Sequence, residues 1–130
     1  MKNKRQKILL CGPGISGDRE LISSLQSHYT LTLTSDIEHL ERNIKINDVA
    51  LILFELSNSR KAELRTIKKI KSKNEELVII VINNQKSIHY VVEVFNAGAI
   101  DVFSAPYKTE LVAERVEAIL KTTDPNEYVY

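Results

Sequence analysis

The feature that most constrains this chain is an unbroken apolar run at residues 49–56, VALILFEL, whose only charged residue is Glu55 near the end. The run is too short to cross a bilayer as a helix. Apolar side chains on both faces, without alternation, are typical of a strand that helices cover on both sides. The run therefore predicts the central strand of a parallel α/β sheet. Ligands bind beyond the carboxyl ends of the strands in such sheets, so Glu55 is a candidate site residue.

Other segments on either side of this run complete the pattern. The strand predicted at residues 7–11 is apolar without alternation after Lys7, as are residues 77–82, and residues 100–103 are predicted to form a short last strand. Residues 29–34 alternate between apolar and polar, as expected of an edge strand. The intervening segments have apolar residues at helical spacing. The first and third helices are predicted at about residues 18–27 and 61–72, and the second begins with a capping box at Ser35 and Glu38. The fourth helix follows Ser87, with Ile88, Val91, Val92 and Phe95 facing inward. The fifth helix begins at Thr109.

The alternation of five strands with five helices predicts the fold class. Right-handed crossovers between parallel strands give an α/β, doubly wound, five-stranded sheet with helices on both faces. The flavodoxin-like order 2-1-3-4-5 places the weaker second strand at an edge. The 130-residue chain suits one domain, over residues 1–121, and residues 122–130 are interpreted as a tail or linker.

Composition narrows the range of functions. The net charge of +1 gives no general reason to bind nucleic acid, and the basic face of the third helix is interpreted as a solvated surface. The single cysteine, Cys11, excludes a disulfide within the chain. No signal peptide or membrane span is found, which predicts a cytoplasmic protein without membrane contact. The three histidines have no metal-ligand spacing and no catalytic set is present, so we expect neither an enzyme nor a cofactor.

One motif supports an alternative function. Residues 12–17, GPGISG, match the G-x-G-x-x-G fingerprint between a strand and a helix, with Gly12, Gly14 and Gly17 as its glycines. Asp36 lies where a ribose-binding acid would follow the second strand. The alternative is a small Rossmann-type nucleotide-binding domain. Acidic residues in the first helical turn and the short strand count argue against it.

The last third of the chain resembles a known family. Residues 96–107, NAGAIDVFSAPY, are similar to the "AGADDYLTKPF" segment of response-regulator receiver domains of the CheY type. The spacing from Glu55 to the third helix is also similar to that family's. The resemblance implies a flavodoxin-like fold and a role in two-component or phosphorelay signal transduction.

The resemblance also implies positions for the phosphorylation site. Receiver domains hold Mg²⁺ with two acidic residues after the first strand, and the matching positions here are Gly12 and Pro13. They phosphorylate an aspartate at the end of the third strand, where this chain has Glu55. Glycine and proline offer no side-chain oxygen to a hard cation.

The remaining site positions differ from the family pattern as well. The hydroxyl position after the fourth strand is Asn83, the aromatic switch position is Val102, and the phosphate-pairing lysine position is Ala105, followed by a retained Pro106. With nothing to neutralise the charge of phosphoryl transfer, we expect a pseudo-receiver that is not phosphorylated. Glu55 is interpreted either as a built-in partial mimic of the phosphorylated state or as a solvated residue at a strand end.

An unphosphorylated receiver is expected to act through protein contacts. In receiver domains the face formed by helix 4, strand 5 and helix 5 is the usual output and dimerisation surface. Tyr90, Val94 and Phe103 are predicted to form an apolar patch on this face, with Tyr90 and Val94 off the inward stripe of their helix. The expected partner is another protein or a second copy of the chain.

Overall fold

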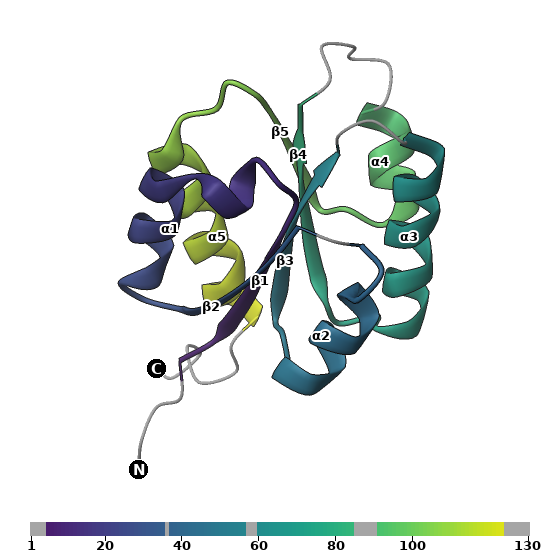
Figure 1. Cartoon of the computed structure of the whole chain (residues 1–130), viewed down its shortest axis with the longest axis horizontal. Coiled ribbons are helices and arrows are strands. Elements are labelled where there is room, and N and C mark those ends of the chain that lie inside the picture. Colours follow the sequence, from purple (N-terminus) through teal and green to yellow (C-terminus); the bar gives the residue numbers. More distant parts are fainter. Residues whose placement is uncertain (1–4, 36, 57–59, 85–90, 124–130) are drawn as a thin grey trace.

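The computed structural model describes residues 5–35, 37–56, 60–84 and 91–123 (Figure 1). Within these residues, five parallel strands form one sheet in the order β2-β1-β3-β4-β5, which confirms the predicted topology. The strands are β1 (Lys7–Cys11), β2 (Thr30–Thr34), β3 (Leu51–Leu56), β4 (Val78–Asn83) and β5 (Asp101–Ser104). The helices are α1 (Arg19–Gln26), α2 (Leu40–Asn47), α3 (Arg60–Lys73), α4 (Val91–Ala97) and α5 (Thr109–Thr123), with a short 3₁₀ helix η1 (Ile15–Gly17).

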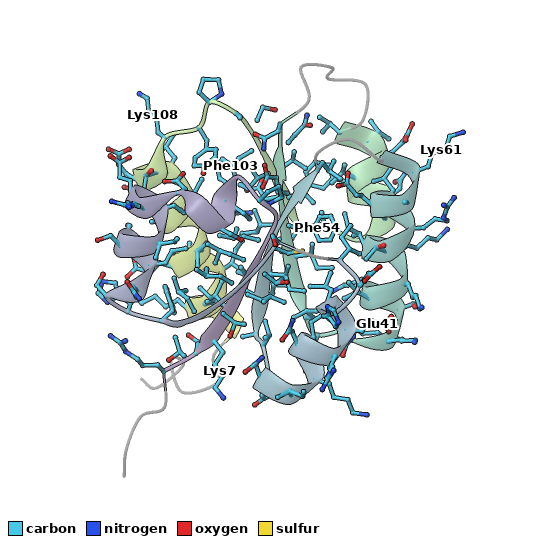
Figure 2. The ribbon with its side chains drawn as sticks, viewed as in Figure 1. Lys7, Glu41, Phe54, Lys61, Phe103 and Lys108 are labelled. Atoms are coloured by element: carbon cyan, nitrogen blue, oxygen red, sulfur yellow. The ribbon has the colours of Figure 1, made fainter. Side chains whose placement is uncertain are left out.

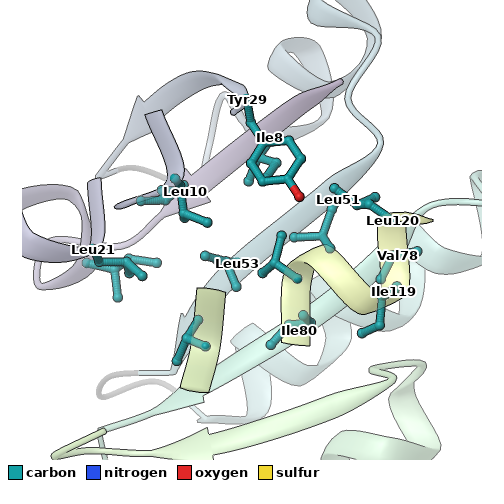
Figure 3. Packing of buried hydrophobic residues seen from close by; sticks show 14 of the residues in the cluster. Ile8, Leu10, Leu21, Tyr29, Leu51, Leu53, Val78, Ile80, Ile119 and Leu120 are labelled. Atoms are coloured by element: carbon teal, nitrogen blue, oxygen red, sulfur yellow. The ribbon is translucent and has the colours of Figure 1, made fainter. Parts of the chain in front are cut away.

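The sheet separates two hydrophobic clusters, one on each face. Helices α1 and α5 cover one face, and α2, α3 and α4 cover the other (Figure 1). Alternate residues of β3 supply both clusters: Leu51 and Leu53 pack toward α1 and α5, while Ile52 and Phe54 pack toward the opposite helices. Figure 3 shows the first cluster, in which the Tyr29 ring packs among aliphatic side chains of the sheet and α5. Unbroken apolarity in β3 and β4 therefore reflects burial on both faces.

Local residues fix one end of α1 and one end of α4. The Asp18 side chain caps α1 by accepting a hydrogen bond from the Leu21 amide at 3.1 Å. Gly98, which follows α4, has a φ of +125°, a region that favours glycine. A Cβ atom there would also lie 2.7 Å from Cγ of Lys71 on α3. Gly98 thus lets the chain leave α4 where it crosses closely over α3.

The predicted start of the second helix is wrong. Helix α2 begins at Leu40, after His39, and no side-chain cap is formed there. The Leu40 amide donates to the Ile37 carbonyl at 3.0 Å, so a turn occupies the stretch where the capping box predicted helix. Ile37 still packs against the core, which explains why its apolar character matched the helical pattern. Asp36 lies outside the described residues.

The phase predicted for the fourth helix is also wrong. Val94 and Ala97 face the core, whereas Val92 and Phe95, predicted to be inward, are 68% and 43% exposed. Apolar residues lie on two faces of this seven-residue helix, so periodicity alone allowed either rotation. Val94 is 1% exposed and therefore belongs to the core, not to a surface patch. Helix α5 runs to Thr123, and residues 124–130 of the expected tail lie outside the described residues.

Candidate functional site

The candidate site lies at the carboxyl ends of β1, β3 and β4. Parallel pairing places Cys11 opposite Phe54, so Gly12 in the loop after β1 comes next to Glu55 of β3. Glu55 pairs with Ile82 of β4, which brings the end of β4 to the other side of the same carboxylate. Glu55 of the central strand therefore lies between the loops that follow β1 and β4, where α/β sheets of this kind bind ligands.

The Glu55 side chain is buried and bound by the protein itself. It is 5% exposed, so its interpretation as a solvated strand-end residue is wrong. One carboxylate oxygen, Oε1, accepts hydrogen bonds from the Gly14 amide at 2.8 Å and the Ile15 amide at 3.1 Å. The other, Oε2, accepts one from the Asn84 side-chain amide. Burial is tolerable because the carboxylate receives donors at both oxygens.

The glycines of the loop after β1 make room for this carboxylate. A Cβ atom on Gly12 would lie 2.4 Å from both Cβ and Oε1 of Glu55, and one on Gly14 would lie 2.5 Å from Oε2. Gly12 also has a φ of +140°, which side-chain-bearing residues rarely adopt. By contrast, nothing lies within 4 Å of a Cβ atom on Gly17. The first two glycines of the motif are therefore explained by Glu55, whereas the third is not.

A second set of polar contacts ties the β5–α5 loop to α1 beside this site. The Tyr107 hydroxyl donates to Oδ2 of Asp18, whose Oδ1 caps α1. The Thr109 hydroxyl at the start of α5 donates to Oε1 of Glu20 at 2.9 Å. Burial, the Asp18 hydrogen bond and the nearby Asp18 and Glu55 charges raise the pKa of Tyr107. The phenol therefore stays protonated and remains a donor at neutral pH.

The other positions that match the receiver site lie around Glu55, and they differ in burial and in their contacts. Asn83 is buried at the end of β4, and its carbonyl accepts a hydrogen bond from the Ala105 amide at 2.9 Å. Val102 packs partly buried against the cluster on the α2–α4 side of the sheet. Ala105 and Pro13 are exposed. Backbone contacts thus join these loops at the site.

The residues at the site do not fit a magnesium ion. Gly12 and Pro13 supply no side-chain oxygen, and an acidic residue at position 12 would collide with Glu55. The Glu55 oxygens are already hydrogen-bonded to the protein. Mg²⁺ requires octahedral oxygen coordination, usually with carboxylates that are free to bind it. Across the described residues, no group of three His, Cys, Asp or Glu side chains could hold a metal elsewhere.

The loop at residues 12–17, the alternative nucleotide-binding site, already uses its backbone amides to bind Glu55. A pyrophosphate would need backbone amides at the turn into the first helix, yet the Gly14 and Ile15 amides donate to Glu55. Gly17 ends η1, and its amide donates to the Gly14 carbonyl at 3.2 Å. Asp18 and Glu20 add negative charge to the entry of α1. The loop is thus built around an internal carboxylate, which disfavours the dinucleotide hypothesis.

The predicted apolar patch on the helix 4–strand 5–helix 5 face needs correction. Val94 is in the core, and Phe103 is partly buried against the cluster beneath α5. Tyr90 lies outside the described residues. The large apolar side chains that are exposed on this face are Val92 and Phe95 of α4, Ile100 before β5, and Leu111 of α5.

Sequence reasoning missed two contributors to the site. No motif in the sequence indicates a role for Asn84, although its side-chain amide donates a hydrogen bond to Glu55. The pairing of Tyr107 with Asp18 joins residues that are 89 positions apart, and no local pattern indicates it. The available signal for Asn84 was its place directly after a buried strand that neighbours the one carrying Glu55.

The comparisons with known proteins agree with this geometry. No protein-family model matches the sequence, and no curated protein matches it either. Solved structures do match: a two-component response regulator from Clostridium difficile has a TM-score of 0.81 at 21% identity, over 92% of this chain and 99% of that one. An orphan response regulator of H. pylori has a TM-score of 0.77 at 24% identity, over 90% and 99%.

A CheY-like receiver domain from Methanospirillum hungatei gives a third match, with a TM-score of 0.76 at 17% identity over 92% of this chain and 96% of that one. These likenesses define the fold class as a flavodoxin-like doubly wound sheet. More narrowly, the chain has the CheY-like fold of response-regulator receiver domains. Among the described residues, no helix has the length and apolar character needed to cross a membrane.

Proposed function

We propose that this chain is a receiver-like domain of a two-component response regulator that signals without being phosphorylated. It would act in the cytoplasm as a protein-interaction or dimerisation module and not as an enzyme. The receiver fold supports the signalling class, because the likeness spans nearly the whole length of a two-component response regulator structure. Gly12, Pro13 and Ala105 stand where receiver domains have two acidic residues and a lysine, which supports signalling that does not depend on phosphorylation.

The observation that carries this proposal is the tethered carboxylate of Glu55. Its charge lies at the end of the central strand and is held by amides from the β1 loop and by Asn84 after β4. A phosphorylated aspartate would likewise place negative charge at the end of this strand. The Glu55 carboxylate is part of the chain itself, so the loops that bind it have one arrangement that needs no phosphoryl donor. Glu55 would in this sense be a partial, built-in substitute for a phosphorylated aspartate.

Phosphorylation can be tested directly with acetyl phosphate and Mg²⁺, followed by intact-mass analysis. We expect no phosphoryl adduct on the chain, while a receiver domain that retains its acceptor aspartate, present in the same mixture, is modified. Glu55→Asp is the informative variant. It restores an acceptor carboxylate but no metal ligands, and so should also stay unmodified. Stoichiometric Mg²⁺-dependent modification of the unaltered chain would refute the proposal.

We further propose that the output surface is the face formed by α4, β5 and α5. Val92, Phe95, Ile100 and Leu111 leave apolar area uncovered there, and exposed apolar patches mark sites of protein–protein contact. The Arg115–Asp101 ion pair, at 2.7 Å, borders the same region and provides a polar rim. The partner would be a second copy or another signalling protein with a complementary apolar surface.

The interface proposal has a matched control within the chain. Phe95→Glu places a carboxylate on α4, and Ile46→Glu places one on α2, where Ile46 is 67% exposed. Sedimentation velocity over a concentration series measures self-association, and pull-down from cell extract followed by identification measures partner binding. We expect Phe95→Glu to weaken association while Ile46→Glu leaves it unchanged. Equal behaviour of the two variants would exclude the α4–β5–α5 face.

A further inference from the structure

Two helices on opposite sides of the molecule carry stripes of opposite charge with the same spacing. Lys61, Arg65 and Lys68 are exposed on α3, and Glu110, Glu114 and Glu117 are exposed on α5. Both sets follow the spacing i, i+4, i+7, which places three side chains on one helix face over about 10 Å. We name them the basic stripe and the acidic stripe.

The basic stripe differs from the other described lysines of α3, which bind groups within the molecule. Lys69 and Lys73 bind Glu41 of α2, at 3.2 and 3.1 Å. Lys71 donates to the carbonyls of Glu75 and Leu77. Among the described residues, no ion pair involves the basic stripe. Figure 2 shows Lys61 on the outer side of α3, directed away from the sheet.

The acidic stripe borders a shallow groove between α1 and α5. This groove, of about 200 Å³, is lined by Glu110, Glu114 and Glu117 and, among other residues, by Leu25, His28 and Ala113. Long basic side chains suit such a groove because their aliphatic stems can cover apolar surface while the charged ends reach carboxylates. The ion pairs between described residues leave the acidic stripe without a cationic partner.

The two stripes cannot meet within one molecule. Helix α5 covers one face of the sheet and α3 the other, so the sheet lies between them (Figure 1). We propose that the basic stripe of one copy docks on the acidic stripe of a second copy. Such a contact is heterologous, because it joins two different surfaces, and it leaves a free stripe at each end for further copies. It would use a different side of α5 from Leu111, and so could coexist with the α4–β5–α5 contact.

This proposal does not depend on the α4–β5–α5 interface, and salt separates the two. A contact between exposed charges weakens as the Debye length shortens, whereas apolar association does not. Sedimentation velocity at about 20 mM and about 400 mM NaCl should show at least about a tenfold weakening of the stripe contact. Self-association that is unchanged between the two salt concentrations would overturn the proposal, even if the apolar interface exists.

Complementation distinguishes a heterologous contact from a symmetric one. Lys61→Gln/Arg65→Gln/Lys68→Gln lacks the basic stripe, and Glu110→Gln/Glu114→Gln/Glu117→Gln lacks the acidic stripe. Neither variant alone should self-associate through the stripes. Mixed at low salt they should form a one-to-one complex that grows no further, since the first supplies only an acidic stripe and the second only a basic one. Failure of the mixture to form this complex would overturn the proposal.

A charge-matched control tests whether net charge alone accounts for the result. Arg19→Gln/Arg42→Gln/Lys45→Gln removes the same amount of positive charge from exposed positions outside the basic stripe. We expect this variant to retain salt-sensitive self-association. Loss of association equal to that of the basic-stripe variant would assign the effect to net charge and overturn the proposal. Circular dichroism verifies that each variant is folded before it is compared.

Discussion

The Glu55 site and the α4–β5–α5 face differ in how their chemical groups are satisfied. At the Glu55 site the loop amides and Asn84 donate to the carboxylate, and a side chain at Gly12 or Gly14 would collide with it. On the α4–β5–α5 face, Val92 and Phe95 remain uncovered although the same helix buries Val94. Buried polar groups are stable only when they are paired, whereas exposed apolar area gains free energy when a partner covers it. The comparison supports the proposal that recognition occurs at the exposed α4–β5–α5 face and not at Glu55.

The most severe test of the closed site is Gly12→Ala. The added Cβ would lie 2.4 Å from Glu55, and the residue would have to keep a φ of +140°. Overpacking and backbone strain together should lower the free energy of unfolding by about 3 kcal/mol or more. Urea denaturation measures this change. Gly17→Ala is the control, because its Cβ meets nothing within 4 Å, and its stability should stay near that of the unaltered chain. Similar stabilities for the two variants would mean that the loop is not packed on Glu55.

The second test removes the carboxylate. Glu55→Ala leaves the Gly14 and Ile15 amides and the Asn84 side chain without their acceptor. Buried donors that lose a charged acceptor cost about 1–3 kcal/mol, and we expect a loss near 3 kcal/mol in urea denaturation. Glu75→Ala, at an exposed position, should have little effect.

Formate provides a chemical check on the same variant. Added formate should raise the melting temperature of Glu55→Ala more than that of the unaltered chain, because the small anion can bind the vacated amides. An equal response of the two proteins would indicate that the amides do not form an anion receptor. In that case the stability loss would come only from lost packing.

Sequence patterns predicted the fold far better than the site. Unbroken apolar runs in β3 and β4 are a direct consequence of burial on both faces, so they identified the sheet, and the alternating pattern of β2 indicated an edge strand. Glu55 was located correctly at the end of β3, but its burial depends on donors from two distant loops, which no local pattern encodes. The rotation predicted for helix α4 was wrong for a different reason. Both of its faces are apolar, although only one packs on the core and the other remains exposed.

The two faces of α4 differ in burial, which variants at Val94 and Val92 can test. Val94→Ala removes two methyl groups from a side chain that is 1% exposed, and it should lower the free energy of unfolding by about 2 kcal/mol. Val92→Ala makes the same chemical change at a side chain that is 68% exposed, and it should leave stability almost unchanged. Urea denaturation and sedimentation velocity on both variants separate the roles. A larger stability loss for Val92→Ala would mean that the helix has the opposite rotation.

The smallest expected effect concerns the Tyr107–Asp18 hydrogen bond at the border of the closed site. Tyr107→Phe removes the donor to Asp18 but keeps the ring, and it should cost about 1 kcal/mol at neutral pH. The pKa of Tyr107 is raised mainly by burial and then by Asp18. Because the folded pKa lies above the unfolded value of about 10, the stabilisation is complete below pH about 10. It is lost as the pH rises through the folded pKa.

Urea denaturation at several alkaline pH values tests this sign. The unaltered chain should lose stability more steeply than Tyr107→Phe above pH about 10, since unfolding releases the Tyr107 proton only when the tyrosine is present. Tyr29, whose pKa is also raised by burial, remains in both proteins, so some alkaline loss persists in the variant. Parallel curves for the two proteins would show that the Tyr107 hydroxyl is solvated. The Thr109–Glu20 hydrogen bond would then remain to hold the start of α5 to α1, and the closed region would end at Glu55.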